Sequence, residues 1–251
     1  MIEIQSIKKS FEDREVLKNI SARFDNGKTN LIIGQSGSGK TVLMKCIVGL
    51  LAPTSGKILY DGRDFVTMSK KEKALLRREM GMIFQSAALF DSMSVLENVM
   101  FPLDMFSSMT LKERTKRAQQ CLDRVNLSEA QKKYPGEISG GMQKRVAIAR
   151  AIALNPKYLF CDEPNSGLDP KTSLVIDALI HDITEEYQMT TIINTHDMNS
   201  VMGIGDSIIF IKEGRQEWKG DKTQVATSDN QALTDFIFAS DLLKKARQAF
   251  I

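Results

Sequence analysis

Gly34-Gln35-Ser36-Gly37-Ser38-Gly39-Lys40-Thr41 is the stretch that decides the fold. All its fixed positions match G-x-x-x-x-G-K-[ST], between the short apolar run Thr29–Ile33 and a predicted buried helix, Lys40–Leu51. The glycines let successive backbone N–H groups converge on phosphate oxygens at a helix N-terminus. Lys40 supplies a charge for the β- and γ-phosphates, and Thr41 a hydroxyl for Mg²⁺. We predict that all eight residues bind a nucleoside triphosphate. The motif does not by itself distinguish a kinase from a GTPase or a motor protein.

The overall composition is that of an ordinary globular protein. The 251 residues are 42% hydrophobic and 26% charged, which excludes a disordered or low-complexity chain. A net charge of +3 lacks the basic excess of a dedicated nucleic-acid binder, so no nucleic-acid partner is expected. Three scattered cysteines and two histidines predict neither a disulfide framework nor a zinc site. With neither a signal peptide nor an apolar run of the ~20 residues that span a bilayer, a cytosolic protein is expected.

Strands are expected near both ends of the chain and helices in the middle. The start contains Val16–Phe24 and Gly56–Tyr60, which fit an antiparallel piece. The last third alternates short apolar β-rich runs with helices, which predicts a parallel sheet covered on both faces. The runs are Tyr158–Cys161, Thr190–Ile193 and Ser207–Ile211, with a helix from Pro170 to about Tyr187.

The middle, from about Ser69 to Leu154, is predicted to be mostly helical. Three S/T-x-x-E capping boxes mark helix starts: Ser69/Glu72, Ser94/Glu97 and Thr110/Glu113. The helix that starts after Thr110 should continue to Val125. The chain is therefore expected to be an α/β protein with a helical insertion in its core.

Two acids follow the apolar run Tyr158–Cys161. Strand ends face the ligand crevice of a parallel sheet, so Asp162 is placed to hold Mg²⁺ and Glu163 to orient or deprotonate an attacking water. Such a pair is often only a solvated loop, but together with the phosphate-binding loop it predicts hydrolysis. Cys161 is expected to be a small buried hydrophobe.

Ser139-Gly140-Gly141 offers a second anion site, at the start of a helix that includes Lys144–Leu154. Since a nucleotide has a single terminal phosphate, two such elements are best explained if each serves a different nucleotide across a dimer. The alternative is an ordinary capped helix.

Together these motifs, in this order and spacing, resemble the ATPase subunits of ATP-binding-cassette (ABC) transporters over essentially the whole chain. The resemblance adds Ser166-Gly167-Leu168-Asp169, His196 after Ile192–Thr195, and Gln85 after Met82-Ile83-Phe84. It implies a P-loop NTPase (RecA-like) α/β core with an antiparallel β subdomain and an inserted helical subdomain. The implied ABC domain is 1–220, with its core at about 1–86 and 157–220, its helical insertion at about 87–156, and a C-terminal extension at 221–251.

The resemblance also assigns roles. Phe11 would stack on adenine, the alternative being a core phenylalanine, and Gln85 would touch Mg²⁺ or the water. Ser139, Gly140 and Gly141 would clamp the γ-phosphate of ATP held by another copy, and Asp169 would cross that interface. Glu163 would be the general base and His196 would contact the γ-phosphate. ATP and Mg²⁺ are thus implied, with catalysis by Glu163, His196, Gln85 and Lys40, and metal binding by Thr41, Gln85 and Asp162.

A finer resemblance is to the ATPases of MCE-associated lipid transporters of the Mla phospholipid type. It is carried by Met80–Leu103, by Ile138–Met142 (ISGGM) and by Ser166–Pro170 (SGLDP). It implies phospholipid cargo, a separate transmembrane permease, an MCE-type lipid-binding component, and a peripheral position on the cytoplasmic face of the inner membrane. The Met- and Phe-rich stretch Ala87–Met109 would cradle the permease or fill the insertion's own core. Within the C-terminal extension, the stretch Asn230–Ile251 would pack on a neighbour or close its own domain.

Several alternatives stay open at this point. Another ABC transporter ATPase, for cargo such as amino acids, would have the same chemistry. A soluble ABC ATPase acting on DNA or ribosomes is disfavoured, because the chain has one cassette and no long coiled coil. A GTPase is disfavoured because Asn194-Thr195-His196-Asp197 does not fit a guanine-reading NKxD motif. A pure scaffold is disfavoured because Lys40, Asp162 and Glu163 are all present.

Overall fold

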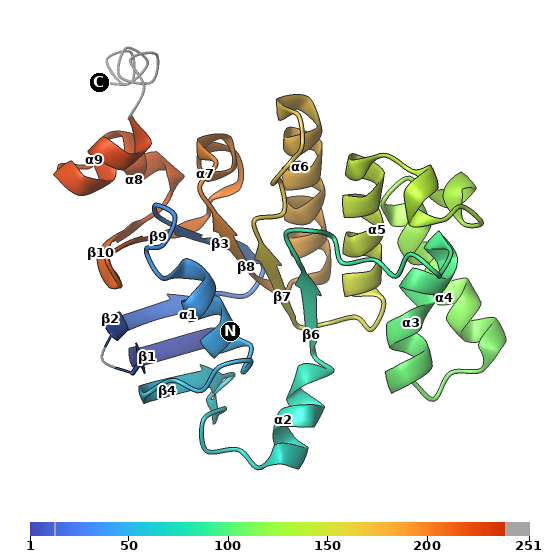
Figure 1. The fold of residues 1–251 in the computed structure, drawn as a ribbon, viewed down its shortest axis with the longest axis horizontal. Helices are drawn as coiled ribbons and strands as arrows, with labels where there is room; N and C mark the ends of the chain where they lie inside the picture. Colours follow the sequence, from blue (N-terminus) through green and yellow to red (C-terminus); the bar gives the residue numbers. More distant parts are fainter. Residues whose placement is uncertain (13, 239–251) are drawn as a thin grey trace.

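A six-stranded sheet forms the centre of the computed structural model, which describes residues 1–12 and 14–238. Its strand order is β10-β9-β3-β8-β7-β6, and every pairing is parallel except that of β10 with β9 (Figure 1). The strands are β3 (Lys28–Ile33), β6 (Met80–Ile83), β7 (Tyr158–Asp162), β8 (Thr190–Thr195), β9 (Ser207–Lys212) and β10 (Arg215–Gly220). Because parallel strands end at the same edge, the loops after β3, β6, β7 and β8 come together there.

A four-stranded antiparallel sheet lies beside the central one, in the order β2-β1-β4-β5. Its strands are β1 (Ile2–Phe11), β2 (Arg14–Phe24), β4 (Ser55–Tyr60) and β5 (Arg63–Asp64). The strands β2 and β4 contain the predicted runs Val16–Phe24 and Gly56–Tyr60, and both pair antiparallel with β1, so the predicted antiparallel piece is confirmed. Phe11 lies at the end of β1.

Alternate residues of the central strands enter two different cores. In β7, Tyr158 and Phe160 pack towards α1 and the antiparallel sheet, whereas Leu159 and Cys161 pack with the helices on the other face. The predicted coverage of both faces is thus confirmed, and so is Cys161 as a buried hydrophobe. The helices are α1 (Lys40–Ile47), α2 (Lys70–Arg77), α3 (Val95–Phe106), α4 (Leu111–Arg124), α5 (Gly140–Ile152), α6 (Pro170–Tyr187), α7 (Met198–Ile204), α8 (Lys222–Ala226) and α9 (Gln231–Ile237).

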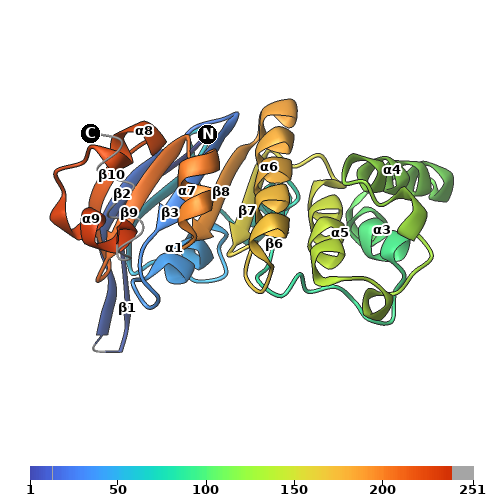
Figure 2. The ribbon, with the colours of Figure 1, turned by 90° about the horizontal axis from the view of Figure 1, so that it is seen from above.

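Helices α3, α4 and α5 gather at one end of the molecule, beyond β6 (Figures 1 and 2). All three predicted capping boxes are present, at the starts of α2, α3 and α4. In each, the serine or threonine side chain accepts from the backbone N–H three residues on, and the glutamate accepts from the cap's own N–H.

Two strands were not foreseen from the sequence, and the predicted end of one helix was wrong. Met80–Ile83 is a strand inside a stretch expected to be mostly helical. Its sequence has a glycine and two methionines where strands usually have β-branched residues. The glycine is needed for packing, because a Cβ on Gly81 would lie 2.5 Å from the Ala151 carbonyl oxygen. Arg215–Gly220 was not foreseen as a strand, because it is a largely polar edge strand joined to β9 through the left-handed pair Glu213-Gly214. The first helix ends at Ile47 rather than Leu51, since Gly49 takes φ +78°.

The described part of the C-terminal extension packs on its own domain. The Phe236 ring stacks on that of Phe210, with centroids 5.2 Å apart, and Leu233 and Ile237 are buried. The alternative of a helix closing its own domain therefore holds as far as residue 238, and the expectation for residues 239–251 lies outside the described residues. None of the helices in the described part of the chain is long and apolar enough to cross a membrane.

Candidate functional site

The backbone of the loop after β3 has a conformation that glycine allows. Gly34, Gly37 and Gly39 have φ of +151°, +79° and +109°. A Cβ on Gly34 would lie 2.2 Å from the Ile211 carbonyl oxygen, and one on Gly39 would lie 2.9 Å from the Leu17 side chain. Helix α1 begins directly after Gly39, so its first N–H groups and its positive dipole end face the loop.

Lys40 is folded back into this loop. Its side chain is buried, and Nζ donates to the carbonyl oxygens of Gly34 (2.7 Å) and Gln35 (3.1 Å). Burial lowers the pKa of the Lys40 ammonium from its ordinary value, while the negative charges of Glu163 and Asp162 oppose that shift. The loop thus encloses a positive charge at its centre, as a phosphate site requires.

Asp162, at the end of β7, faces the start of α1. Its Oδ1 accepts from Asn194 Nδ2 at 2.9 Å and from Thr41 Oγ1 at 3.4 Å. Ser38 Oγ and Asn194 Oδ1 are buried, and neither has a hydrogen-bond partner within the described chain. Hydroxyl and carboxylate oxygens are the ligands that Mg²⁺ prefers, and it normally binds through one or two of them plus substrate phosphates. The residues fit that cation: Thr41 and Asp162 would hold it, and it would neutralise developing phosphate charge.

Among the described residues, no group of three or more His, Cys, Asp or Glu side chains could hold a metal ion by itself. A site with the single carboxylate Asp162 is in keeping with a metal that arrives with its nucleotide.

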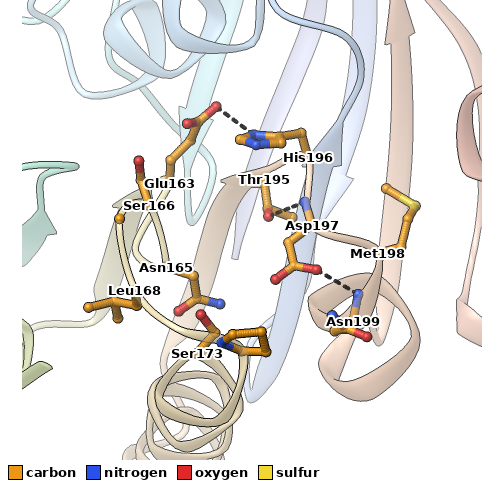
Figure 3. A pocket seen from close by; sticks show the side chains of 12 residues that line it. Glu163, Asn165, Ser166, Leu168, Ser173, Thr195, His196, Asp197, Met198 and Asn199 are labelled. Carbon is orange, nitrogen blue, oxygen red and sulfur yellow. Dashed lines mark hydrogen bonds and ion pairs between the residues drawn. The ribbon is translucent and has the colours of Figure 1, made fainter.

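Glu163 lies one residue beyond the strand end, in a left-handed backbone conformation with φ +48°. Its Oε1 lies 3.1 Å from His196 Nδ1 (Figure 3). Its Oε2 accepts from Gln85 Nε2 at 3.5 Å. Gln85 Nε2 also donates to Ser166 Oγ at 2.9 Å. The loops after β6, β7 and β8 therefore bring Gln85, Glu163 and His196 together.

An open pocket of about 430 Å³ lies between the Glu163–Pro170 loop and the His196–Asn199 segment. The Glu163–His196 pair lies at one end of it, and Asn165 and Ser173 lie at the other (Figure 3). The carboxylate of Glu163 thus borders a space that admits solvent and ligand.

Ser139, Gly140 and Gly141 are not brought to the Gly34–Thr41 loop of the same chain. Ser139 caps α5, its Oγ accepting from Met142 N–H at 3.3 Å, and α5 lies beyond β7 and β6 from α1 in both views (Figures 1 and 2). Asp169 caps α6 and is exposed; hydrogen bonds from the Thr172 side chain and backbone lower the pKa of its carboxyl. The Ser139–Gly141 segment is therefore remote from Lys40 of its own chain (Figure 1), and Asp169 is open to solvent.

Phe11 is 43% exposed, with Lys9 Nζ 4.8 Å from its ring centroid. The alternative of a core phenylalanine is therefore wrong, and an exposed ring is free to stack on a base.

Sequence reasoning missed two cations of α5, the buried Lys144 and the half-buried Arg150, that hold the loop of Gln85. Lys144 Nζ donates to the Gln85 carbonyl oxygen at 2.5 Å, and Arg150 donates to those of Ala87 and Ala88, both at 2.7 Å. The signal was present, because both cations lie in a helix whose other residues are largely small or apolar. Asn194, which positions Asp162, was missed because it had been considered only as part of a guanine-reading motif.

The sequence model of the ABC transporter family matches residues 17–166. The chain belongs to this family. It is 36% identical over 236 residues to the probable ribonucleotide transport ATP-binding protein of Mycobacterium leprae (strain TN), a match covering 94% of this chain and 68% of that protein. It is 39% identical over 238 residues to the glutamine transport ATP-binding protein of Escherichia coli (strain K12), covering 94% and 98%.

A solved structure gives the same fold for an ABC cassette. The dimeric post-hydrolysis state of the cassette MJ0796, bound to ADP and Pi, superposes with a TM-score of 0.79 at 33% identity, covering 88% of this chain and 99% of that one. The P-loop NTPase fold implied by the sequence is confirmed, and this ABC transporter subunit binds and hydrolyses ATP.

Proposed function

We propose that ATP is held by Gly34–Thr41 and hydrolysed at Glu163. The observation that carries this assignment is the meeting of four loops at one sheet edge, which places the buried Lys40 ammonium near two carboxylates, one of them bordering an open pocket. In this scheme Lys40 binds the β- and γ-phosphates, and Thr41 and Asp162 hold Mg²⁺ with Gln85 alongside. Glu163 takes a proton from the attacking water, and His196 orients Glu163 and contacts the γ-phosphate.

The cassette is proposed to work as a homodimer in which each ATP lies between two copies. Ser139, Gly140 and Gly141 are exposed or half-exposed and far from Lys40 of their own chain, and a relative of this fold is described as dimeric with ADP and Pi. In the dimer these residues would cap the γ-phosphate held by the partner, and Asp169 would cross the interface. Phe11 would stack on the adenine.

The dimer proposal is tested with Glu163→Gln protein and ATP in gel filtration. A stable dimer is expected that returns to monomer when ATP is removed. A structure of that variant in which a lone copy encloses its nucleotide would overturn the proposal.

The cassette is proposed to act on a separate transmembrane permease from the cytoplasmic face of the membrane. Several large apolar side chains in or next to the α3–α4 region are exposed, which is the kind of adaptable surface that accepts a partner helix. They are Phe84, Phe90, Met105, Phe106, Met109 and Leu111. Other residues of the Met- and Phe-rich stretch Ala87–Met109, such as Met100 and Leu103, are buried. In this proposal the stretch both fills the core of the helical insertion and leaves a docking surface.

Lipid, and phospholipid in particular, is the proposed cargo, with an MCE-type lipid-binding component in the complex. The support is the resemblance of Met80–Leu103 and Ile138–Met142 to the Mla-type ATPases. Amino acids are the second candidate, because one relative is named for glutamine transport. Purifying the complex with its permease and identifying the co-purified small molecules by mass spectrometry separates the two. Phospholipid that stimulates ATP turnover supports the first candidate, and stimulation by an amino acid alone overturns it.

A further inference from the structure

A polar cluster with two buried members, Asp177 and Ser200, adjoins the pocket that Glu163 borders. It joins Asn165 of the loop after β7, Asp177 in the middle of α6, and Ser200 of α7. Asn165 Nδ2 donates to Asp177 Oδ1 at 2.7 Å, and Ser200 Oγ donates to Asp177 Oδ2 at 2.7 Å. Asn165 Nδ2 also lies 3.2 Å from Ser200 Oγ, so the three side chains form a closed set.

The central carboxyl of this cluster is costly to bury. Asp177 is 4% exposed and lies on the same helix as the core residues Ile176 and Ile180. Burial raises the pKa of Asp177 to about 6, against the effect of the hydrogen bonds from Ser200 and Asn165. Among the described residues, the titratable groups that act on it are Asp197, at the start of α7, and Cys161, in β7, and the charge next to it is the negative charge of Asp197.

One partner of Asp177 lies in a wall of the pocket, and the other is the next residue after the opposite wall. Asn165 follows Glu163 by two residues and precedes Ser166, which accepts from Gln85. Ser200 follows His196 by four residues and comes directly after the segment His196–Asn199, which forms the opposite wall. Figure 3 shows Asn165 on the side of the pocket away from the Glu163–His196 pair.

We propose that Asp177 is a positioning residue for ATP hydrolysis, which fastens the Glu163-bearing loop to the His196-bearing segment through Asn165 and Ser200. With the walls joined at one end, Glu163 and His196 keep the separation of 3.1 Å at the other. Asp177 itself touches neither of them and does not react. Its effect is on the alignment of the general base, on which the rate of proton transfer depends.

The test compares substitutions at Asp177 that remove or keep its hydrogen bonds. Asp177→Ala removes both, and kcat is expected to fall about tenfold or more while KM for ATP stays within about twofold, because Lys40 and its loop are untouched. Asp177→Asn is expected to keep kcat within about twofold of the wild type. Its Oδ1 still accepts from Asn165, and Ser200 can accept from its Nδ2 instead of donating.

A mutant cycle identifies the route of the effect. Asn165→Ala is expected to lower kcat by a similar factor, and the Asp177→Ala/Asn165→Ala pair to be no slower than the worse single variant, since both break one link. Thr184→Ala is the matched control, because Thr184 is another fully buried polar residue of α6, hydrogen-bonded to Thr191 and remote from the pocket. It should lower the unfolding temperature without changing kcat.

A folded Asp177→Ala protein with wild-type kcat overturns the inference. So does a double variant whose loss of kcat equals the product of the losses in Asp177→Ala and Asn165→Ala. If Asp177→Ala does not fold, Asn165→Ala and Ser200→Ala carry the test, and wild-type kcat in both overturns it equally. The inference rests on the proposed role of Glu163, so Glu163→Gln is measured alongside. Normal turnover by Glu163→Gln refutes the role of Glu163, whereas an inactive Glu163→Gln with an unaffected Asp177→Ala refutes only that of Asp177.

Discussion

The proposed phosphate-binding loop, Gly34–Thr41, and the proposed catalytic edge around Glu163 are held in shape in different ways. The loop is one continuous segment, in which backbone conformation and close backbone packing fix the shape, and its one charged side chain is held by the loop's own carbonyls. The catalytic edge is assembled from side chains of three separate loops, held to one another by single contacts such as Gln85–Ser166 and His196–Glu163. Changes in the first should therefore affect binding and turnover together, and changes in the second should affect turnover alone.

The largest effect is expected for Lys40→Ala. It removes the buried ammonium at the centre of the loop, so ATP affinity should fall at least about a hundredfold and turnover should be lost with it. Binding of a fluorescent ATP analogue and phosphate release measure the two. Lys45→Ala, an exposed lysine on the same helix, is the control and should change neither. Wild-type affinity in Lys40→Ala would remove the distinction between the two regions.

Glu163→Gln is the matching change at the catalytic edge. The amide keeps the size of the side chain but cannot take a proton, so kcat should fall by about 10²–10³ while ATP affinity is retained. Single-turnover phosphate release and equilibrium binding give the two values. Glu217→Gln, at an exposed position of β10, is the control. Normal turnover by Glu163→Gln would show that another group is the base.

Gly39→Ala tests whether backbone conformation is what fixes the loop. An alanine at position 39 must take φ +109°, and its methyl group must approach the Leu17 side chain at 2.9 Å. The strain should cost about 2–3 kcal/mol and weaken ATP binding about tenfold or more. Gly203→Ala is the matched control, since a Cβ at that position in α7 meets no atom within 4 Å. It should stabilise the fold by about 0.5–1 kcal/mol. The comparison is made by urea denaturation with and without ATP, and equal effects at the two glycines would contradict it.

The same contrast explains what the sequence could predict. The loop was predictable in full, because a contiguous motif fixes both residue types and conformation, and the helix caps were predictable for the same local reason. The pair Asp162-Glu163 could be placed at the sheet edge because it ends an apolar run. The contacts that align Glu163 could not be predicted, since Gln85, Ser166 and His196 meet only through the strand order.

The buried cluster of Asn165, Asp177 and Ser200 has no local sequence signal at all. In the sequence Asp177 is one polar position in an 18-residue helix, and whether it faces solvent or the core depends on which face of α6 meets the sheet. Strand β6 was hidden in the same way, because its pairing with β7 and its contact with α5 are tertiary. Local sequence patterns thus predict the Gly34–Thr41 loop, whereas the contacts that align Glu163 depend on long-range packing.

The smallest expected effect is on stability, and it tests whether the buried carboxyl of Asp177 destabilises the fold. The Asp177 carboxyl titrates at about 6 in the fold and near its ordinary value of 3.8 in the unfolded chain. Between these values the folded state holds more protons, so the free energy of unfolding falls as the pH rises through this range and is lowest, for this group, above about pH 6. Asp177→Asn removes the buried charge and should stabilise the protein by about 1–2 kcal/mol at pH 8, and by less at pH 5. Urea denaturation at the two pH values measures the difference. A stability gain that is the same at both would show that the Asp177 carboxylate is not disfavoured by burial, whereas a gain at pH 8 alone would show that the catalytic edge keeps a charge at the expense of stability.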